Sequence, residues 1–134
     1  MNFEDFQALA MRTAKPLPFK ESLRHVAYGV TGEAGEFADC IKKHDIYEQE
    51  LNAQNAIEEL GDLLYYIAVG ADAFEISMQD IARGVINKLK KRYPETYTNE
   101  LAKARLDKQS IDDATQEDWD EAARIAMVKA KGAE

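Results

Sequence analysis

The chain has 134 residues, a size at which a single domain buries roughly two-thirds of its unfolded surface without disulfides or metals to hold it together. Its 25 acidic and 17 basic residues give a formal net charge of −8, which argues against binding to duplex DNA, because proteins that bind the phosphate backbone carry a basic surplus. The lone Cys40 cannot form an internal disulfide, and neither a signal-peptide pattern nor a membrane-spanning apolar run is recognisable. We therefore expect a cytoplasmic protein with no membrane partner.

Helices are expected throughout, because seven glycines and three prolines supply few of the turn clusters that an all-β chain needs. Apolar residues recur at helical spacing over four segments, at about 2–14, 21–44, 53–74 and 78–93. The pair Pro16 and Pro18 separates the first two, Ser77 caps the fourth, and Pro94 ends it. A loop of about 20 residues should then lead to a weaker last helix near 116–131.

Two pairs of acidic residues stand three positions apart on the second and third expected helices: Glu33 with Glu36, and Glu59 with Asp62. This spacing places both members of a pair on one side of a helix. If the two helices pack antiparallel, four carboxylates converge at the edge of the core, where they must either raise some pKa values or bind cations. An all-oxygen set of this kind suits Mg²⁺, with Mn²⁺ as a second candidate.

Other interpretations of these acids stay open at this point. Acidic pairs at this spacing are common on solvated helix faces, where they need no ligand. A di-iron carboxylate bundle requires Glu-x-x-His on two helices, and neither His25 nor His44 lies three residues after a glutamate. Glycines weaken both helices, a cost that close approach of another backbone or of a ligand would explain; they are Gly29, Gly32, Gly35 and Gly61.

The fourth expected helix ends in a basic segment. Lys88, Lys91 and Arg92 fall within about 100° of arc on the helix. Spacing alone favours a simple interpretation, in which cations are stabilised at a helix C-terminus. The functional alternative is a phosphate grip, in which the planar fork of Arg92 and the point charges of the lysines bind phosphate oxygens.

Three segments in this order, GEAGE at 32–36, EELGDLLYY at 58–66 and KLKKRYP at 88–94, resemble the MazG-like all-α nucleoside triphosphate pyrophosphohydrolases. The resemblance covers residues 2–98. It implies an all-α, four-helix-bundle-type fold completed by assembly into a homodimer or homotetramer. It also implies Mg²⁺ dependence and cleavage of a (d)NTP between its α and β phosphates. On this basis we expect residues 1–100 to form the MazG-like domain and 101–134 a C-terminal helical extension of it.

The resemblance also assigns residues to the site. It implies that the metal ligands and catalytic residues are Glu33, Glu36, Glu59 and Asp62. It places the triphosphate on Lys88, Lys91 and Arg92. His25, at a position where many relatives carry His or Asn, is a substrate-binding candidate, although a lone histidine is more often structural; Lys43, on the same side of the helix, is a weaker phosphate candidate.

The expected reaction is attack on the α-phosphorus by a water that Mg²⁺ activates, with one carboxylate, Glu36 or Glu59, as a candidate proton acceptor. Two alternatives remain: a non-catalytic helical oligomer that binds nucleotides or a partner protein, and a hydrolase of a noncanonical nucleotide or an alarmone. The intact set of four acids favours an enzyme over a binding protein. The base and sugar preference is not predicted.

Overall fold

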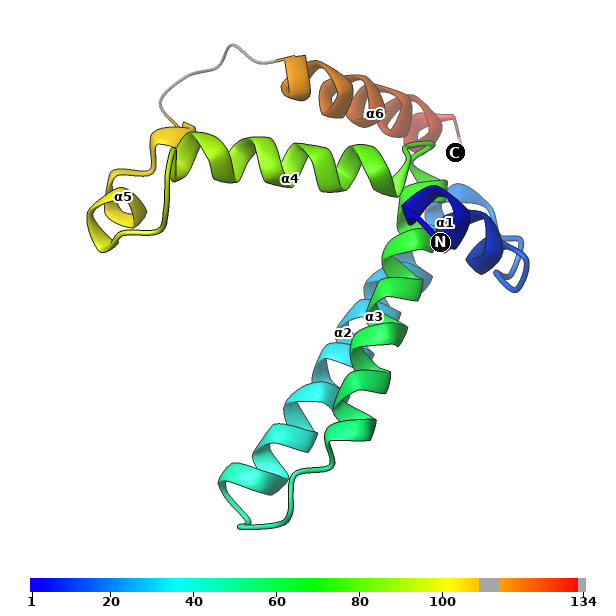
Figure 1. Cartoon of the computed structure of the whole chain (residues 1–134). Coiled ribbons are helices and arrows are strands. Elements are labelled where there is room, and N and C mark those ends of the chain that lie inside the picture. Colours follow the sequence, from blue (N-terminus) through cyan, green and yellow to red (C-terminus); the bar gives the residue numbers. More distant parts are fainter. Residues whose placement is uncertain (109–113, 133–134) are drawn as a thin grey trace. The chain divides into compact units, whose positions relative to one another are not determined.

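A computed structural model of the chain describes residues 1–108 and 114–132, and within these residues every regular element is a helix (Figure 1). The side chains of residues 114–119 and 122 lie outside the description. The helices group into two compact units, which we name the first unit (1–73) and the second unit (74–134). The all-α expectation is confirmed, whereas the predicted domain boundary near residue 100 stays a prediction.

The first unit is a long helical hairpin with one short helix packed on it. Helices α2 (Phe19–Asp45) and α3 (Ala53–Ala73) lie side by side and antiparallel, and α1 (Phe3–Met11) packs against α3 (Figure 1). The side chain of Asn52 caps α3, because its Oδ1 accepts the backbone N–H of Asn55 at 3.1 Å. The antiparallel hairpin is the arrangement that lets the acidic edges of α2 and α3 meet.

Small residues make up the core of this hairpin. Ala68 and Ala71 of α3 are fully or almost fully buried, whereas larger apolar side chains of the same helix stay accessible. The exposed fraction is 69% for Ile57, 50% for Leu60 and 40% for Ile67. Two helices bury only one stripe of each other, so a broad apolar face remains uncovered within the unit. This uncovered face is where a second copy of the chain could pack, whereas the oligomer itself stays a prediction from the family resemblance.

The second unit is arranged around α4 (Met78–Arg92). Ser77 caps this helix, since its Oγ accepts the backbone N–H of Asp80 at 3.0 Å. The helix ends at the residue before the C-cap Tyr93, as the following Pro94 predicts. Within the described residues, no helix in either unit is both long and apolar enough to cross a membrane.

The expected loop after α4 contains helices that the sequence analysis missed. They are α5 (Asn99–Ala104) and the short 3-10 helix η1 (Leu106–Lys108), which precede α6 (Ala114–Lys131). The sequence did contain a signal for α5, because Thr98 is a favoured N-cap residue. In the structure its Oγ1 accepts the backbone N–H of Leu101 at 3.1 Å. These three elements all contact α4.

Candidate metal and substrate site

The hairpin brings three of the four candidate metal ligands together. One carboxylate oxygen from each of Glu33, Glu59 and Asp62 lies within 4.8 Å of the other two. Glu33 belongs to α2, and the other two residues belong to α3. The fourth candidate, Glu36, is exposed and lies outside this group of three, beside Glu59 on the wall of a pocket.

The electrostatics of this cluster favour a positively charged ligand. The pKa of Glu33 is raised, first by burial of the carboxyl group and then by the negative charges of Asp62, Glu36 and Glu59. A divalent cation among these carboxylates would relieve the repulsion that a proton on Glu33 otherwise relieves. The ligand atoms are all oxygens, so the set fits a hard ion such as Mg²⁺ or Mn²⁺.

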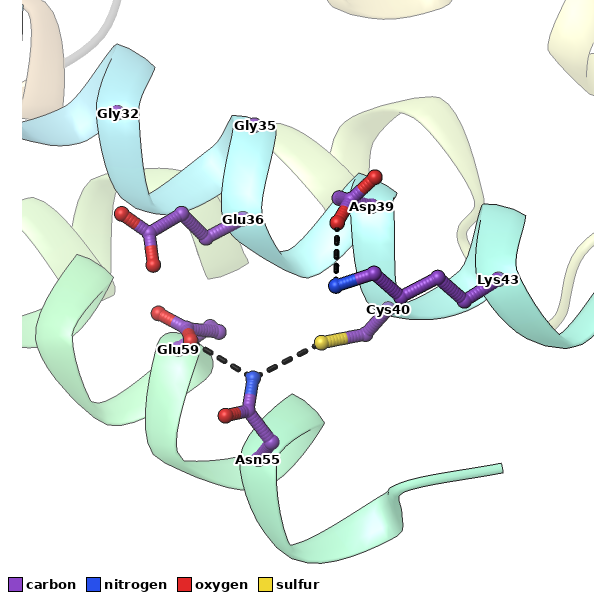
Figure 2. Close-up of a pocket in the computed structure, with 8 residues that line it drawn as sticks. All are labelled: Gly32, Gly35, Glu36, Asp39, Cys40, Lys43, Asn55 and Glu59. Carbon is purple, nitrogen blue, oxygen red and sulfur yellow. Dashed lines mark hydrogen bonds and ion pairs between the residues drawn. The ribbon is translucent and has the colours of Figure 1, made fainter. Parts of the chain in front are cut away.

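A pocket of about 400 Å³ opens between α2 and α3 next to these carboxylates (Figure 2). Its lining consists of Gly32, Gly35, Glu36, Asp39, Cys40, Lys43, Asn55 and Glu59. A Cβ atom added to Gly32 or Gly35 would meet nothing within 4 Å. Within the described residues, no atom of this chain therefore approaches these two glycines closely, and room for a ligand remains beside them.

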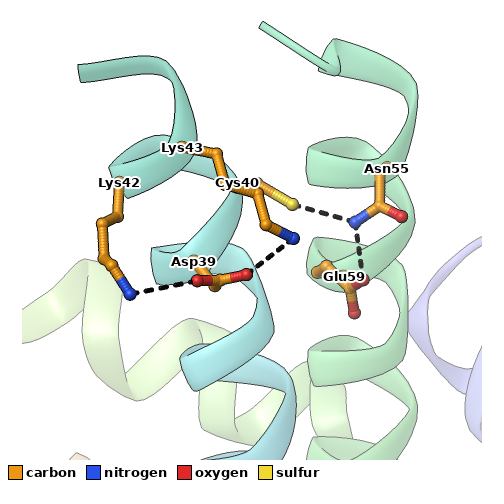
Figure 3. Close-up of polar contacts among 6 residues, drawn as sticks. All are labelled: Asp39, Cys40, Lys42, Lys43, Asn55 and Glu59. Carbon is orange, nitrogen blue, oxygen red and sulfur yellow. Dashed lines mark hydrogen bonds and ion pairs between the residues drawn. The ribbon is translucent and has the colours of Figure 1, made fainter. Parts of the chain in front are cut away.

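Polar contacts at the pocket join the two helices (Figure 3). Asn55 Nδ2 donates to Glu59 Oε1 at 2.8 Å and to Cys40 Sγ at 2.9 Å. On α2, the ammonium group of Lys43 lies 2.8 Å from the carboxylate of Asp39. Hydrogen bonding to Asp39 raises the pKa of Lys43, so this lysine stays charged but already has a carboxylate partner. Its role as a phosphate ligand stays a prediction.

His25 packs against an aromatic ring. Its imidazole meets the ring of Tyr66 edge-to-face, with 5.5 Å between ring centroids. One turn later on α2, a Cβ atom at Gly29 would lie only 2.2 Å from the same ring, so glycine is required there for Tyr66 to fit. This contact gives His25 a packing role, and its predicted role in substrate binding stays a prediction.

The three basic candidates lie at the end of α4, in the second unit. Lys88 is exposed and Lys91 is half-buried. Arg92 forms a two-pronged ion pair, in which its Nε and Nη2 each donate to a carboxylate oxygen of Asp107 at 2.6 Å. The hydrogen bonds from Arg92 lower the pKa of Asp107 to about 2. The fork that a phosphate would use is thus bound to Asp107, and the phosphate role of all three residues stays a prediction.

Sequence reasoning missed two residues of consequence. Asn55 stands four residues before Glu59, a spacing that places both on one face of α3, but it could equally be interpreted as a helix cap. Asp107 lies fifteen residues after Arg92 and is reached only through the fold of α5 and η1, so no local pattern indicates it.

Comparison with known proteins gives a match to a family model and matches to individual proteins. The model of the MazG nucleotide pyrophosphohydrolase domain matches residues 21–97, which include both acidic pairs and the basic end of α4. The chain is 34% identical over 77 residues to the Gene 37 protein of Mycobacterium phage L5, a match that covers 54% of this chain and 67% of that protein. It is also 34% identical over 70 residues to the uncharacterized protein YvdC of Bacillus subtilis strain 168, covering 46% and 66% respectively. No solved structure matches.

Proposed function

The chain belongs to the MazG nucleotide pyrophosphohydrolase family, and from this premise we propose that it cleaves a (d)NTP between the α and β phosphates in an Mg²⁺-dependent reaction. The products would be a (d)NMP and pyrophosphate. The observation that carries the proposal is the cluster of Glu33, Glu59 and Asp62 oxygens within 4.8 Å of one another, inside the matched residues. Its neighbouring pocket is of the size that small-molecule ligands occupy.

We assign two roles to the four carboxylates, metal binding and proton acceptance. Glu33, Glu59 and Asp62 would hold the cation, with Glu36 as the fourth ligand candidate. When bound, Mg²⁺ supplies charge neutralisation at the phosphoryl oxygens and lowers the pKa of water. Glu36 is exposed at the pocket and lies outside the group of three, so it is the best placed carboxylate to accept the proton of the attacking water.

Basic groups would stabilise the departing pyrophosphate. The candidates are Lys88, Lys91 and Arg92, with Lys43 and His25 as further substrate contacts. Arg92 must give up the carboxylate of Asp107 to bind phosphate, which ranks it below the exposed Lys88. The same ranking of the basic residues applies to any triphosphate substrate.

The experiment that tests the proposal is phosphorus NMR of the purified protein with each canonical NTP and dNTP, with and without Mg²⁺. We expect metal-dependent release of monophosphate and pyrophosphate. Glu59→Gln should lower the rate by at least about a hundredfold, because even outer-shell partners of metal ligands cost up to that factor. The matched control is Glu58→Gln, which alters the exposed neighbouring acid of α3 and should keep the wild-type rate.

Other outcomes of this experiment would redirect the assignment. Release of orthophosphate, or full activity in Glu59→Gln, would contradict the proposed cleavage or the proposed site. Tight nucleotide binding without turnover would favour the non-catalytic binding protein. No reaction with any canonical nucleotide would move the proposal to a noncanonical nucleotide or an alarmone as substrate.

We further propose that copies of the chain associate through the apolar face of α3, as a homodimer or homotetramer. Ile57 and Leu60, which are 69% and 50% exposed, are the reason, because a soluble protein seldom leaves such a face bare. Light scattering should give a mass that is a multiple of the monomer, and Ile57→Glu should shift the protein toward the monomer. A monomeric wild-type protein would contradict this.

A further inference from the structure

We infer that Asn55 is a positioning residue, which fixes the carboxylate of Glu59 for binding of a divalent cation. The inference rests on the proposed function, since it takes Glu59 as a metal ligand. It adds a residue that neither the acidic motif nor the family resemblance assigns. The observation that carries it is the hydrogen bond from Asn55 Nδ2 to Glu59 Oε1, at 2.8 Å (Figure 3).

The burial of Glu59 makes this hydrogen bond matter. The residue is only 6% exposed, and a buried carboxylate is costly unless donors are directed at it. Asn55 lies one helical turn earlier on α3, so its amide reaches the carboxylate along the helix surface. The Asn55 amide binds only one of the two carboxylate oxygens of Glu59. The other oxygen is not used by this amide and can face a cation.

The amide of Asn55 is itself held from two sides. Its Nδ2 also donates to Cys40 Sγ on α2, with 2.9 Å between nitrogen and sulfur (Figure 3). A flipped amide would place the Asn55 Oδ1 against the negative charge of Glu59, so the charge of the carboxylate selects the observed orientation. A side chain that is anchored to both helices restricts rotation of the Glu59 carboxylate, as outer-shell partners of metal ligands do.

Helix capping does not account for Asn55. The cap of α3 is the side chain of Asn52, which accepts the backbone N–H of Asn55 at 3.1 Å. The side chain of Asn55 is therefore not used at the helix terminus and instead contacts Glu59 and Cys40. Its amide can be removed with the cap intact, which makes the proposed role separable from the folding of α3.

The experiment is a titration with Mn²⁺, in which electron paramagnetic resonance measures the free ion. Asn55→Leu keeps a similar volume and removes the donor, and should weaken Mn²⁺ binding about tenfold, within the range found for outer-shell partners. The matched control is Gln54→Leu, at the exposed preceding position of α3, which should leave the affinity unchanged. Cys40→Ala keeps the bond between Asn55 and Glu59 and should cost less than Asn55→Leu.

Two further measurements separate positioning from general destabilisation. Affinity is expressed per folded molecule, with helix content taken from circular dichroism, and Asn55→Ser serves if Asn55→Leu does not fold. In a Glu59→Ala background, which removes the acceptor of the Asn55 hydrogen bond, removal of the Asn55 amide should cause no further loss of affinity, because the two residues act through one interaction. In turnover assays, the Mg²⁺ concentration for half-maximal rate should rise while the nucleotide KM at saturating Mg²⁺ stays constant.

The outcomes distinguish the two levels of the proposal. If the wild-type protein does not bind Mn²⁺, the metal site is wrong, and the role of Asn55 falls with it. If the wild-type protein binds Mn²⁺ and Asn55→Leu or Asn55→Ser binds it equally tightly per folded molecule, the role of Asn55 is wrong and the metal site stands. A loss of affinity that persists in the Glu59→Ala background would also overturn positioning through Glu59.

Discussion

The acidic cluster of the first unit and the ion pair of the second unit hold their charges in opposite ways. Around Glu33, carboxylates of like charge gather and raise its pKa. At the end of α4, Arg92 binds both oxygens of Asp107, whose side chain is 1% exposed, and lowers the pKa of that carboxyl to about 2. Among the described residues, the first group is dominated by repulsion between like charges, whereas the second is an ion pair.

This difference separates a cluster that a bound cation would stabilise from an ion pair that is satisfied without a ligand. Repulsion among the acids lowers the stability of the metal-free protein, and a bound cation would remove it. A shifted pKa therefore indicates a functional site where the side chains also lie close enough to share a ligand. A paired arginine and aspartate hold η1 against α4 and need no ligand. By residue type alone, both clusters would be assigned to substrate binding, because carboxylates suit the metal of a triphosphate and an arginine suits its phosphates.

The largest expected effect is stabilisation of the folded protein by a bound metal. At a concentration one hundred times its Kd, Mg²⁺ should add about 2.7 kcal/mol to the free energy of unfolding. Glu33→Gln should remove most of this gain and, without metal, should raise the melting temperature because one repelling charge is gone. Scanning calorimetry with Mg²⁺ and with EDTA measures both, with Glu58→Gln as control. A full Mg²⁺ gain in Glu33→Gln would contradict the assignment of a cation to the repelling carboxylates of the first unit.

The next effect concerns the ion pair. Asp107→Ala leaves the guanidinium of Arg92, which is 20% exposed, without its carboxylate, so the second unit should lose stability. Glu121→Ala is the matched control, because it breaks the exposed pair with Arg124 on α6 and should cost about 0–1 kcal/mol. Urea unfolding followed by circular dichroism compares the two. Equal losses would mean that the paired charges of α4 and η1 are no more structural than a surface ion pair.

The smallest effects are pH dependences of opposite sign. The pKa of folded Asp107, about 2, lies below its ordinary value of 3.8, so its contribution is full above 3.8 and is lost as pH falls toward 2. The stabilities of wild type and Asp107→Asn should therefore converge over that acid range.

Glu33 should behave in the reverse way. Its folded pKa is raised, so its protonated form is favoured at low pH, and the metal-free protein loses stability as pH rises through that pKa. The advantage of Glu33→Gln over wild type should thus be absent in acid and grow toward neutral pH. Urea titrations in EDTA at a series of pH values test both curves, and curves of the same sign would refute the contrast.

Local sequence patterns accounted for the helices where caps and breakers are explicit. Ser77 and Pro94 bound α4 as expected, and periodicity placed α2 and α3 within a few residues of their ends. The Thr98 cap was equally legible but opens a helix of only six residues, too short for an apolar period to show. Ile57 and Leu60 followed the periodic pattern and yet stay exposed in the hairpin, because a pattern shows which residues share a face and not what covers it.

The helical class and the positions of the acids at i and i+3 follow from the amino-acid sequence alone, because they depend on contacts within one or two turns. The family follows from it as well, because its motifs are short segments in a fixed order. Only the tertiary structure decided that Glu33 of α2 meets Glu59 and Asp62 of α3, that Asn55 serves Glu59 instead of capping its helix, and that Asp107 binds the fork of Arg92. Glu33 and Asp107 meet their partners on other segments of the chain, and a local pattern holds no information on how those segments pack. The spacing of Asn55 and Glu59 is local, but only the cap by Asn52 and the contact with Cys40 show which of two local roles the Asn55 amide takes.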